Sequence, residues 1–425
     1  MRARLTASSG SAAFERVQFR YDGTLVIEKK RREIGIGCFI SSRRARRYVD
    51  QALDANRLSY GPFHRRFEAA FAAEHDSRHA IFCNSGTSAL HLAVQALKEK
   101  YLWKDGDEVL VPSVTFIATS NVVLQNRLKP VFVDVDPQTF NIDPAKIEAR
   151  LTKRTRAVMP VHLLGLPAEM DPIRMIAARR GLKIVEDSAE TMFARYKGRK
   201  VGSLGDIGCF STHIAHFIVT GVGGLATTSD ADLIIRLRSL MNHGRDSIYL
   251  SIDDDKDAMG DQLHDIVAKR FQFVSVGHSF RATELEAALG VAQLEEKDKI
   301  TKGRATIVRR LTAGLREFED RLQLPTCPPD RDHAFMLYGL VLRGQDKTGL
   351  VNFLEDRGVE TRDMMPLLNQ PVYKRLFGDL EARNPVARML NRSAFCIGCH
   401  QHMTTDDVNY VVEQFRAFFR GPGAR

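Results

Sequence analysis

The chain has 425 residues, of which 44% are hydrophobic and 27% charged, a balance typical of a soluble globular protein with more than one core. Lysine and arginine outnumber aspartate and glutamate by 62 to 52, and the net charge of +10 favours an anionic partner such as a phosphorylated small molecule. The positive residues are dispersed without a recognition motif, so we expect no nucleic-acid binding. No apolar run reaches the roughly eighteen residues that cross a bilayer, so we expect no membrane span.

The N-terminus and the cysteines indicate a cytoplasmic protein. The first residues, MRARLTASSGSAAFER, include arginines but lack the apolar segment of a secretory signal. Six cysteines in a chain of this length are typical of reduced thiols. Residues Cys396 to His400 match the C-x-x-C-H spacing of c-type haem attachment, which requires export. We therefore interpret this motif as a tight turn before the last helix.

The first part of the chain is predicted to be an extension over residues 1–34. Within it, Asp22-Gly23 between two short apolar stretches indicates a β-hairpin. Amphipathic patterns then predict one helix over residues 42–53 and a second one over residues 63–73.

From residue 80 onward, predicted strands alternate with predicted helices. Apolar, β-branched runs predict strands within residues 80–86, 108–114, 129–136, 157–165 and 183–189, with helices at 87–97, 118–126 and 172–180. This order predicts an α/β fold with a mainly parallel sheet covered on both faces. Such sheets bind ligands beyond the carboxyl ends of their strands. The polar residues that follow these ends are Asn84 to Thr87, Thr115, His162 and Asp187.

The next segment contains a predicted helix at residues 232–240 and an acidic loop, SIDDDKDAMGD. Its aspartates, Asp253, Asp254, Asp255 and Asp257, have the ligand type of a cation site, but a solvated loop is the simpler interpretation. An amphipathic helix follows within residues 276–296.

A long helix from about Lys302 leads into a smaller α+β unit. Its strands are predicted at residues 334–342 and 359–364, and a helix at 407–419 closes the chain. We therefore divide the chain into an N-terminal extension (1–34), a large domain (35–300) and a small C-terminal domain (301–425).

Three short motifs lie at the predicted ligand-binding edge. Asn84 to Ser88 stands between a strand and a helix, where it either binds an anion or only caps the helix. Asp187 ends a strand. It is either a helix cap or the partner of a protonated ring nitrogen. The glycine turn at residues 220–224 says little alone about nucleotides.

Taken together, the ordered blocks resemble one family. They are NSGTSAL, VPSVTFIAT, VFVDVDPQTFNID, PVHLLGLPAEMDPI, IVEDSAE, YKGRKVGSLGDIGCFSTH, TGVGG and FRATELEAALGVAQL. They resemble the DegT/DnrJ/EryC1/StrS family over about residues 34–419. The resemblance implies the fold-type I pyridoxal-phosphate (PLP) transferase architecture, with a mainly parallel large domain and a smaller α+β C-terminal domain. It also implies activity on nucleotide-linked keto-sugars.

The same resemblance implies how the cofactor is held. Gly86, Thr87 and Ser211 would bind its phosphate. Phe116 would stack on the pyridine ring, and Asp187 would keep the ring nitrogen protonated.

Four further positions receive roles from the resemblance. Ser279 stands where the family has an asparagine that reaches a neighbouring subunit's cofactor, so a homodimer is implied. Glu190 replaces a common glutamine at the cofactor, where it either repels an anion or acts as a second acid or base. His213 and Arg281 are assigned to the substrate, with a structural salt bridge as the alternative for Arg281.

The sequence departs from the family at one decisive position. The family has a lysine three residues after the position of His213, and this lysine binds the cofactor as a Schiff base. Here that position is His216, and residues 205–229 contain no lysine. The pair Ala215-His216 resembles the subgroup of sugar 3-dehydratases, in which pyridoxamine phosphate (PMP) stays free. His216 would then be the general base and general acid.

The cysteines choose between the two branches of this subgroup. No cysteine lies between Asp246 and Cys327, which excludes the iron–sulfur branch. The other branch resembles GDP-4-keto-6-deoxymannose 3-dehydratase and regenerates its cofactor with glutamate. The His213 and His216 spacing suits a metal, but no third ligand is placed, so we expect no metal.

The sequence thus predicts a cytoplasmic, homodimeric dehydratase that removes the C3 hydroxyl of a nucleotide-linked 4-keto-6-deoxy sugar. Its predicted cofactor is non-covalent PLP or PMP, and its predicted co-substrate is L-glutamate. One alternative is a sugar aminotransferase-like enzyme that uses another group in place of the lysine. A second alternative is a catalytically silent, ligand-binding homologue.

Overall fold

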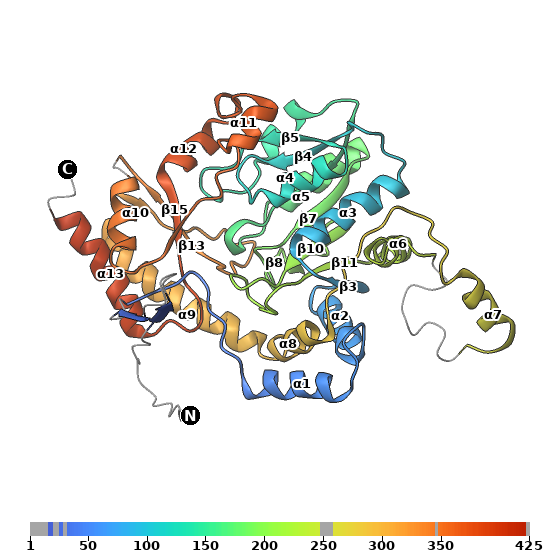
Figure 1. Ribbon diagram of the computed structural model, residues 1–425. Helices are drawn as coiled ribbons and strands as arrows, with labels where there is room; N and C mark the ends of the chain where they lie inside the picture. The colour runs from blue at the N-terminus through green and yellow to red at the C-terminus, as the bar shows by residue number, and fades with distance from the viewer. Residues whose placement is uncertain (1–15, 20–24, 29–31, 247–257, 345–346, 422–425) are drawn as a thin grey trace.

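A seven-stranded sheet forms the centre of the chain (Figure 1). The computed structural model describes residues 16–19, 25–28, 32–246, 258–344 and 347–421. The strand order is β3-β11-β10-β7-β6-β4-β5, and β11 alone runs antiparallel to its neighbours. Their bounds are β3 His79–Cys83, β4 Glu108–Pro112, β5 Lys129–Val133, β6 Thr155–Val158, β7 Lys183–Asp187, β10 Ile207–Ser211 and β11 Gly224–Thr228. The predicted α/β class with a mainly parallel sheet is confirmed.

Helices surround this sheet. Those of the first 300 residues are α1 Arg43–Asp54, α2 Pro62–Glu74, α3 Gly86–Lys100, α4 Ala118–Gln125, α5 Met170–Arg180, α6 Ala231–Met241, α7 Gly260–Lys269 and α8 Glu284–Leu294. Helix α3 packs against β10 and β11, and α5 packs against β6 and β7. Short 3-10 helices occur at Pro144–Lys146, Glu148–Arg150 and Leu163–Gly165. No described helix is long and apolar enough to cross a membrane.

The C-terminal part is built on a second, antiparallel sheet with the order β12-β13-β15-β14. Its elements are α9 Lys297–Leu315, β12 Leu322–Gln323, β13 Tyr338–Leu342, α10 Lys347–Glu355, β14 Thr361–Asp363, α11 Pro371–Phe377, α12 Pro385–Ser393, β15 Ala394–Ile397 and α13 Thr405–Arg420, with 3-10 helices at Arg316–Phe318 and Glu381–Arg383. A hydrophobic cluster between this sheet, α9 and α13 is separate from the cluster around the large sheet. The domain boundaries at residues 34 and 300 stay a prediction.

Local sequence signals explain where several helices begin. The Ser42 side chain caps α1 by accepting a hydrogen bond from the Ala45 N–H. A capping box of Thr283 and Glu286 starts α8. These caps satisfy backbone donors that the first turn of a helix leaves without partners.

The sequence predictions miss two features of local structure. A turn does precede the last helix, at residues 401–402, but Cys396 lies in β15, a strand that pairs with both β13 and β14. Both Cys396 and Cys399 are buried there. Helix α7 was not predicted, because its sequence follows the acidic loop without a strong start signal.

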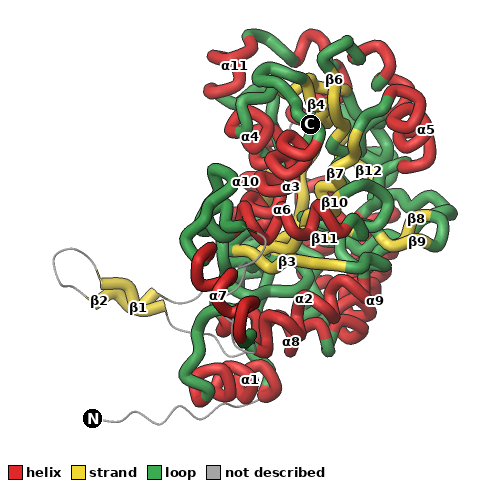
Figure 2. The backbone as a smooth tube through the Cα atoms, turned by 90° about the vertical axis from the view of Figure 1, so that its right-hand side faces the viewer, coloured by secondary structure: helices red, strands yellow, loops and turns green. Residues whose placement is uncertain are grey.

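Two other predictions fall partly or wholly outside the residues that the structure describes. The expected hairpin is present as β1 Arg16–Phe19 paired antiparallel with β2 Leu25–Glu28, which stands away from the rest of the chain in Figure 2. Its predicted turn at Asp22-Gly23 lies outside the described residues. The aspartates of the acidic loop, residues 253–257, also lie outside them.

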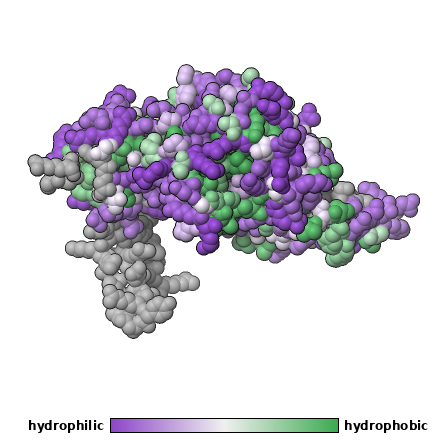
Figure 3. Space-filling view, turned by 90° about the horizontal axis from the view of Figure 1, so that it is seen from above, coloured by the Kyte–Doolittle hydropathy of each residue, from purple (hydrophilic) through white to green (hydrophobic). Residues whose placement is uncertain are grey.

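The surface near α7 is unusually apolar (Figure 3). Large hydrophobic side chains are exposed on this helix and on either side of it: Met259, Val267, Phe271, Phe273, Val274 and Val276. Three of them are more than three-quarters exposed, Met259 at 82%, Phe271 at 80% and Val276 at 86%. Exposed apolar patches of this kind are typical of interaction surfaces.

Candidate active site

A cavity of about 960 Å³ opens beyond the carboxyl ends of the parallel strands. Because β11 runs in the opposite direction, its first residues lie at the same edge. The lining includes Ser85, Gly86, Thr87, Thr115, Phe116, Thr119, Asp187, Glu190, Ser211, His213 and His216. Most of the candidate residues from the sequence therefore converge on one cavity, as the strand-end argument predicts.

The N-terminus of α3 forms one wall of the cavity. Ser85 caps the helix, and its Oγ accepts a hydrogen bond of 3.0 Å from the Ser88 N–H. Gly86 packs so closely on β10 that a Cβ would stand only 2.7 Å from the Ser211 Cβ. Gly224 is equally confined, because a Cβ there would lie 2.4 Å from the Gly86 nitrogen. The glycines bring a helix N-terminus and the Ser211 hydroxyl together, which is a geometry suited to a phosphate.

Asp187 lies at the end of β7 and is buried, 4% exposed. The Thr119 hydroxyl donates to its Oδ2 at 2.7 Å, and the Ala189 N–H donates to its Oδ1 at 3.1 Å. Burial raises the pKa of this carboxyl, although these hydrogen bonds lower it. No described lysine or arginine forms an ion pair with Asp187. A protonated ring nitrogen of a bound ligand would provide the missing positive partner for this buried carboxylate.

Glu190 is a second buried carboxyl in the cavity. Its Oε2 accepts a hydrogen bond of 2.8 Å from the Leu164 N–H. Burial, opposed by the Leu164 hydrogen bond and helped by the nearby Asp187, raises the pKa of Glu190 to about 7. A carboxyl with this pKa is present in both protonation states near neutral pH, which suits proton exchange.

His216 is carried by the segment between β10 and β11, residues 212–223. The Thr212 and Thr220 hydroxyls form a hydrogen bond of 2.6 Å across this segment. Gly221 and Gly223, with φ of +92° and +146°, turn the chain back into β11. The His216 N–H donates to the His213 carbonyl at 2.9 Å.

The imidazole of His216 is mostly buried, and its Nδ1 has no hydrogen-bond partner among the described residues. Burial, together with the neighbouring His213 and Arg304, lowers the pKa of His216 to about 3. The ring is therefore neutral over the physiological range and has a lone pair that can accept a proton.

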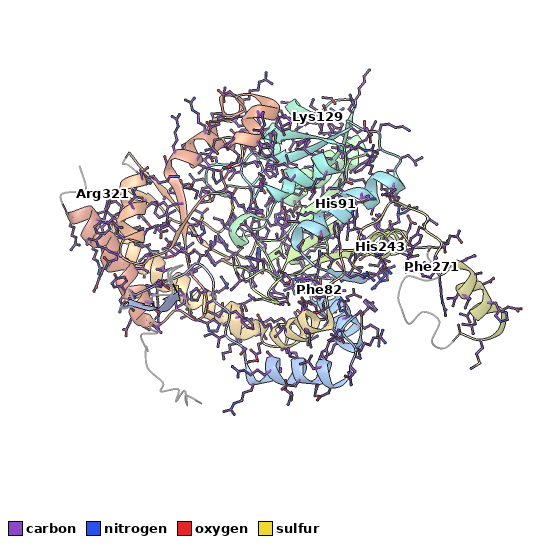
Figure 4. All side chains as sticks on the ribbon, in the orientation of Figure 1. Phe82, His91, Lys129, His243, Phe271 and Arg321 are labelled. Atoms are coloured by element: carbon purple, nitrogen blue, oxygen red, sulfur yellow. The ribbon has the colours of Figure 1, made fainter. Side chains whose placement is uncertain are left out.

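Two of the predicted site residues do not reach this cavity. Ser279 and Arg281 are exposed and bonded to each other, with the Arg281 Nη2 donating to the Ser279 Oγ at 3.1 Å. Arg281 also lies 3.4 Å from the His243 Nε2, and Figure 4 shows His243 and Phe271 together on the α7 side of the molecule. The assignment of Arg281 to a substrate in its own chain's cavity gains no support from this position.

His162 was a candidate strand-end residue, but it does not line the cavity. It is fully buried, with its Nε2 3.0 Å from the Glu186 Oε2. Its Nδ1 accepts a hydrogen bond from the Ala168 N–H at 3.0 Å. His162 therefore has both ring nitrogens satisfied, and its place is structural.

The sequence reasoning missed the residues that the C-terminal sheet contributes. Glu360, Arg362 and Asp363 line the cavity, and Arg362 forms an ion pair with Glu360. Ile36 lines it as well, and its N–H donates to the Glu360 Oε2 at 2.8 Å. No local motif marks these residues, because they reach the cavity only through tertiary packing.

The N-terminus of α3 and the Ser211 hydroxyl, which we call the phosphate seat, suit the phosphate of a phosphorylated pyridine. The buried Asp187, which has no cationic partner among the described residues, suits its ring nitrogen. Phe116 is 59% exposed and lines the same cavity, so its ring is available for stacking. The fold and the site therefore define a PLP-binding protein.

Comparisons with known proteins agree. The model of the DegT/DnrJ/EryC1/StrS aminotransferase family matches residues 40–416, and the chain belongs to this family. GDP-perosamine synthase of Caulobacter vibrioides is 37% identical over 372 residues, which cover 86% of this chain and 93% of that protein. The dTDP-4-dehydro-2,6-dideoxy-D-glucose 3-dehydratase of Saccharopolyspora spinosa is 33% identical, with 87% and 83% covered.

Among solved structures, a GDP-4-keto-6-deoxymannose-3-dehydratase with bound GDP-perosamine superposes with a TM-score of 0.81 at 25% identity. The match covers 90% of this chain and all of that one. The predicted fold, family and cofactor are confirmed. The family comprises PLP-dependent enzymes that modify nucleotide sugars.

Proposed function

We propose that the protein is a dehydratase that removes the C3 hydroxyl of a nucleotide-linked 4-keto-6-deoxy sugar, with PMP as a non-covalent cofactor. The observation that carries this proposal is the residue at position 216. His216 lines the cavity where the family resemblance implies a lysine, and no lysine occurs among the described residues of the lining. An imidazole cannot form the covalent bond on which ordinary transamination depends.

The residues of the cavity divide the work of the reaction. When bound, PMP supplies an amine for the ketone of the sugar and a ring that withdraws electrons. Gly86, Thr87 and Ser211 hold the phosphate, and Asp187 holds the ring nitrogen. His216 takes a proton from the carbon that bears the amine and delivers it to the departing hydroxyl oxygen.

Glu190 is the second proton-exchanging group of the proposal. Its pKa of about 7 makes it half protonated near neutral pH. It contacts the Leu164 backbone, which fixes the carboxyl at the cavity wall. His216 ends each turnover neutral, as it began, so we assign Glu190 to a separate proton exchange with the bound sugar or with water in the same cavity.

The substrate and co-substrate follow from the charges of the cavity. Similar proteins carry GDP- and dTDP-linked sugars in their names, which supports a nucleotide sugar. Arg362 is the cation that lines the cavity from the C-terminal sheet. It suits the diphosphate of such a sugar or the carboxylate of L-glutamate, the proposed amino donor.

We propose a homodimer as the working form. Ser279 and Arg281 lie outside their own chain's cavity and on the exposed surface, where they are available to a second copy. The apolar side chains of Phe271 and Val276 are exposed on the same stretch of chain and would be covered in such a pair. Light scattering at micromolar concentration tests this, and a monomer would contradict it.

A sugar aminotransferase is the second candidate, because the 37% identical relative is a GDP-perosamine synthase. Incubation with a 4-keto-6-deoxy nucleotide sugar, PMP and L-glutamate separates the candidates. Loss of the C3 hydroxyl with release of ammonia supports the dehydratase. A stable amino sugar supports the aminotransferase. Bound cofactor without turnover supports a silent homologue.

Position 216 provides the sharpest variants. His216→Gln should keep PMP binding and lose dehydration by at least about a hundredfold, the size of a lost general base. His216→Lys should instead create the absorbance of a lysine-bound cofactor. His79→Gln is the control, since it changes a histidine at the start of β3, at the opposite end of that strand from the cavity. Full dehydration by His216→Gln would refute the assigned role.

A further inference from the structure

Arg304 in α9 is a cation held in an unusual place. Its side chain is 2% exposed, and no carboxylate of a described residue lies within ion-pairing distance. The guanidinium stacks instead on the Phe217 ring, 4.8 Å from the ring centre, and its Nε has no partner among the described residues. Burial of a cation that has no carboxylate partner is costly, and here carbonyl oxygens, the Phe217 ring and Cys399 surround the guanidinium instead.

The hydrogen bonds of Arg304 link two walls of the cavity. Its Nη1 donates to the carbonyls of Met336 at 2.8 Å and Phe335 at 3.2 Å. Its Nη2 donates to the carbonyl of His216 at 3.3 Å. Met336 lines the cavity, and Phe335 has a left-handed backbone with φ of +56°, a conformation that surrounding contacts must hold.

We propose that Arg304 is a positioning residue for His216: it anchors the backbone of His216 to the Phe335 and Met336 segment and holds a fixed positive charge beside the imidazole. This inference rests on the proposed role of His216 as the proton-transferring group. Arg304 itself does not line the cavity and contacts His216 only at its backbone carbonyl.

The charged surroundings of His216 agree with this proposal. Arg304 lowers the pKa of His216, and it also lowers the pKa values of His400 and His402, which lie just beyond β15. His213 acts in the same direction, while a backbone hydrogen bond at Ala189 opposes it. Arg304 is thus a shared source of positive potential that keeps the imidazole of His216 neutral at rest and favours release of any proton that the ring takes up.

The test compares Arg304→Met and Arg304→Lys with a control, Arg331→Met. The Arg331 side chain is 7% exposed, stacks on Tyr196 and donates to the Pro167 carbonyl; it pairs with Asp330 and has no bond to His216. Nitrogen NMR of the histidines in the PMP-loaded protein measures the protonated fraction of His216 between pH 4.5 and 8. The His216 signal is identified by its loss in His216→Gln.

Removal of the charge should raise the protonated fraction of His216 at pH 4.5 about tenfold, which is a shift of about one pH unit. Arg331→Met should leave that fraction unchanged. Arg304→Lys keeps the charge but loses the planar fork, so it should retain the wild-type fraction and lose turnover at least about tenfold. Equal protonated fractions in Arg304→Met and Arg331→Met would overturn the electrostatic part, and full turnover of Arg304→Lys would overturn the anchoring part.

Failure of this inference differs from failure of the proposed function. If His216→Gln still removes the C3 hydroxyl, the proposed function is wrong whatever the titration gives. If His216→Gln is inactive while both Arg304 variants behave as the wild type, only the inference is wrong. Thermal melts of all variants verify that the compared proteins are folded.

Discussion

Replacement of Glu190 by glutamine should make the protein more stable at alkaline pH. The carboxyl is buried beside Asp187, and its single acceptor bond to the Leu164 N–H can be kept by the amide oxygen of glutamine. The substitution therefore removes an ionisable group while it preserves shape and the hydrogen bond.

The direction and size of this change in the free energy of unfolding follow from the linkage between protonation and folding. The pKa of Glu190 rises from its ordinary value of 4.5 to about 7 in the fold, so the native state holds this proton more tightly than the unfolded chain does. The wild type therefore loses stability as pH rises from about 4.5 to 7, and the loss is complete above that. The raised pKa corresponds to about 3 kcal/mol at pH 8.

Urea unfolding of the cofactor-free proteins at pH 4.5, 6, 7 and 8 measures this effect. Glu190→Gln should match the wild type at pH 4.5 and exceed it by about 3 kcal/mol at pH 8. Glu169→Gln, a change at an exposed glutamate, should show no such pH dependence. A constant difference between Glu190→Gln and the wild type across these pH values would refute the reasoning.

Three further changes test the structure, two of them in the cofactor-binding cavity and one at the start of α2. Gly86→Ala places a Cβ 2.7 Å from the Ser211 Cβ, so PMP affinity measured by fluorescence should fall at least about tenfold, and an unchanged affinity would remove the phosphate seat from α3. Asp187→Asn should weaken PMP binding by a similar factor and shift the absorbance of the bound ring, because a neutral amide does not balance a protonated nitrogen. Glu284→Gln should lower the free energy of unfolding by about 1–3 kcal/mol in urea, since Glu284 accepts bonds from the Gly61, Phe63 and His64 N–H groups at the start of α2. A stability within error of the wild type would show that the neutral amide caps α2 equally well.

Local sequence signals were sufficient for much of the large sheet. The strand before Asn84 and the strand ending at Asp187 are buried, so apolar runs and the polar residues that follow them predicted both the sheet and its ligand-binding edge. The position of His216 was visible because a whole ordered set of motifs fixed its register.

Tertiary effects account for what the sequence did not predict. Arg362 and Glu360 reach the cavity from a different sheet, and an arginine on an edge strand has no local mark of that role. Cys396 belongs to a short strand whose assignment depends on pairing with β13 and β14 rather than on its own pattern. Arg304 looks like an ordinary helix residue until its three carbonyl partners are brought together.

The excursion between β10 and β11 has a consequence for how such enzymes diversify. Ser211 and Gly224 are paired in the sheet, so residues 212–223 leave and return at adjoining positions. The phosphate seat and Asp187 are supplied by other elements, and the excursion contributes the residue at position 216. In the proposed function, one substitution in this loop changes the reaction type, while the register of the sheet and the cofactor-binding residues outside the loop stay the same.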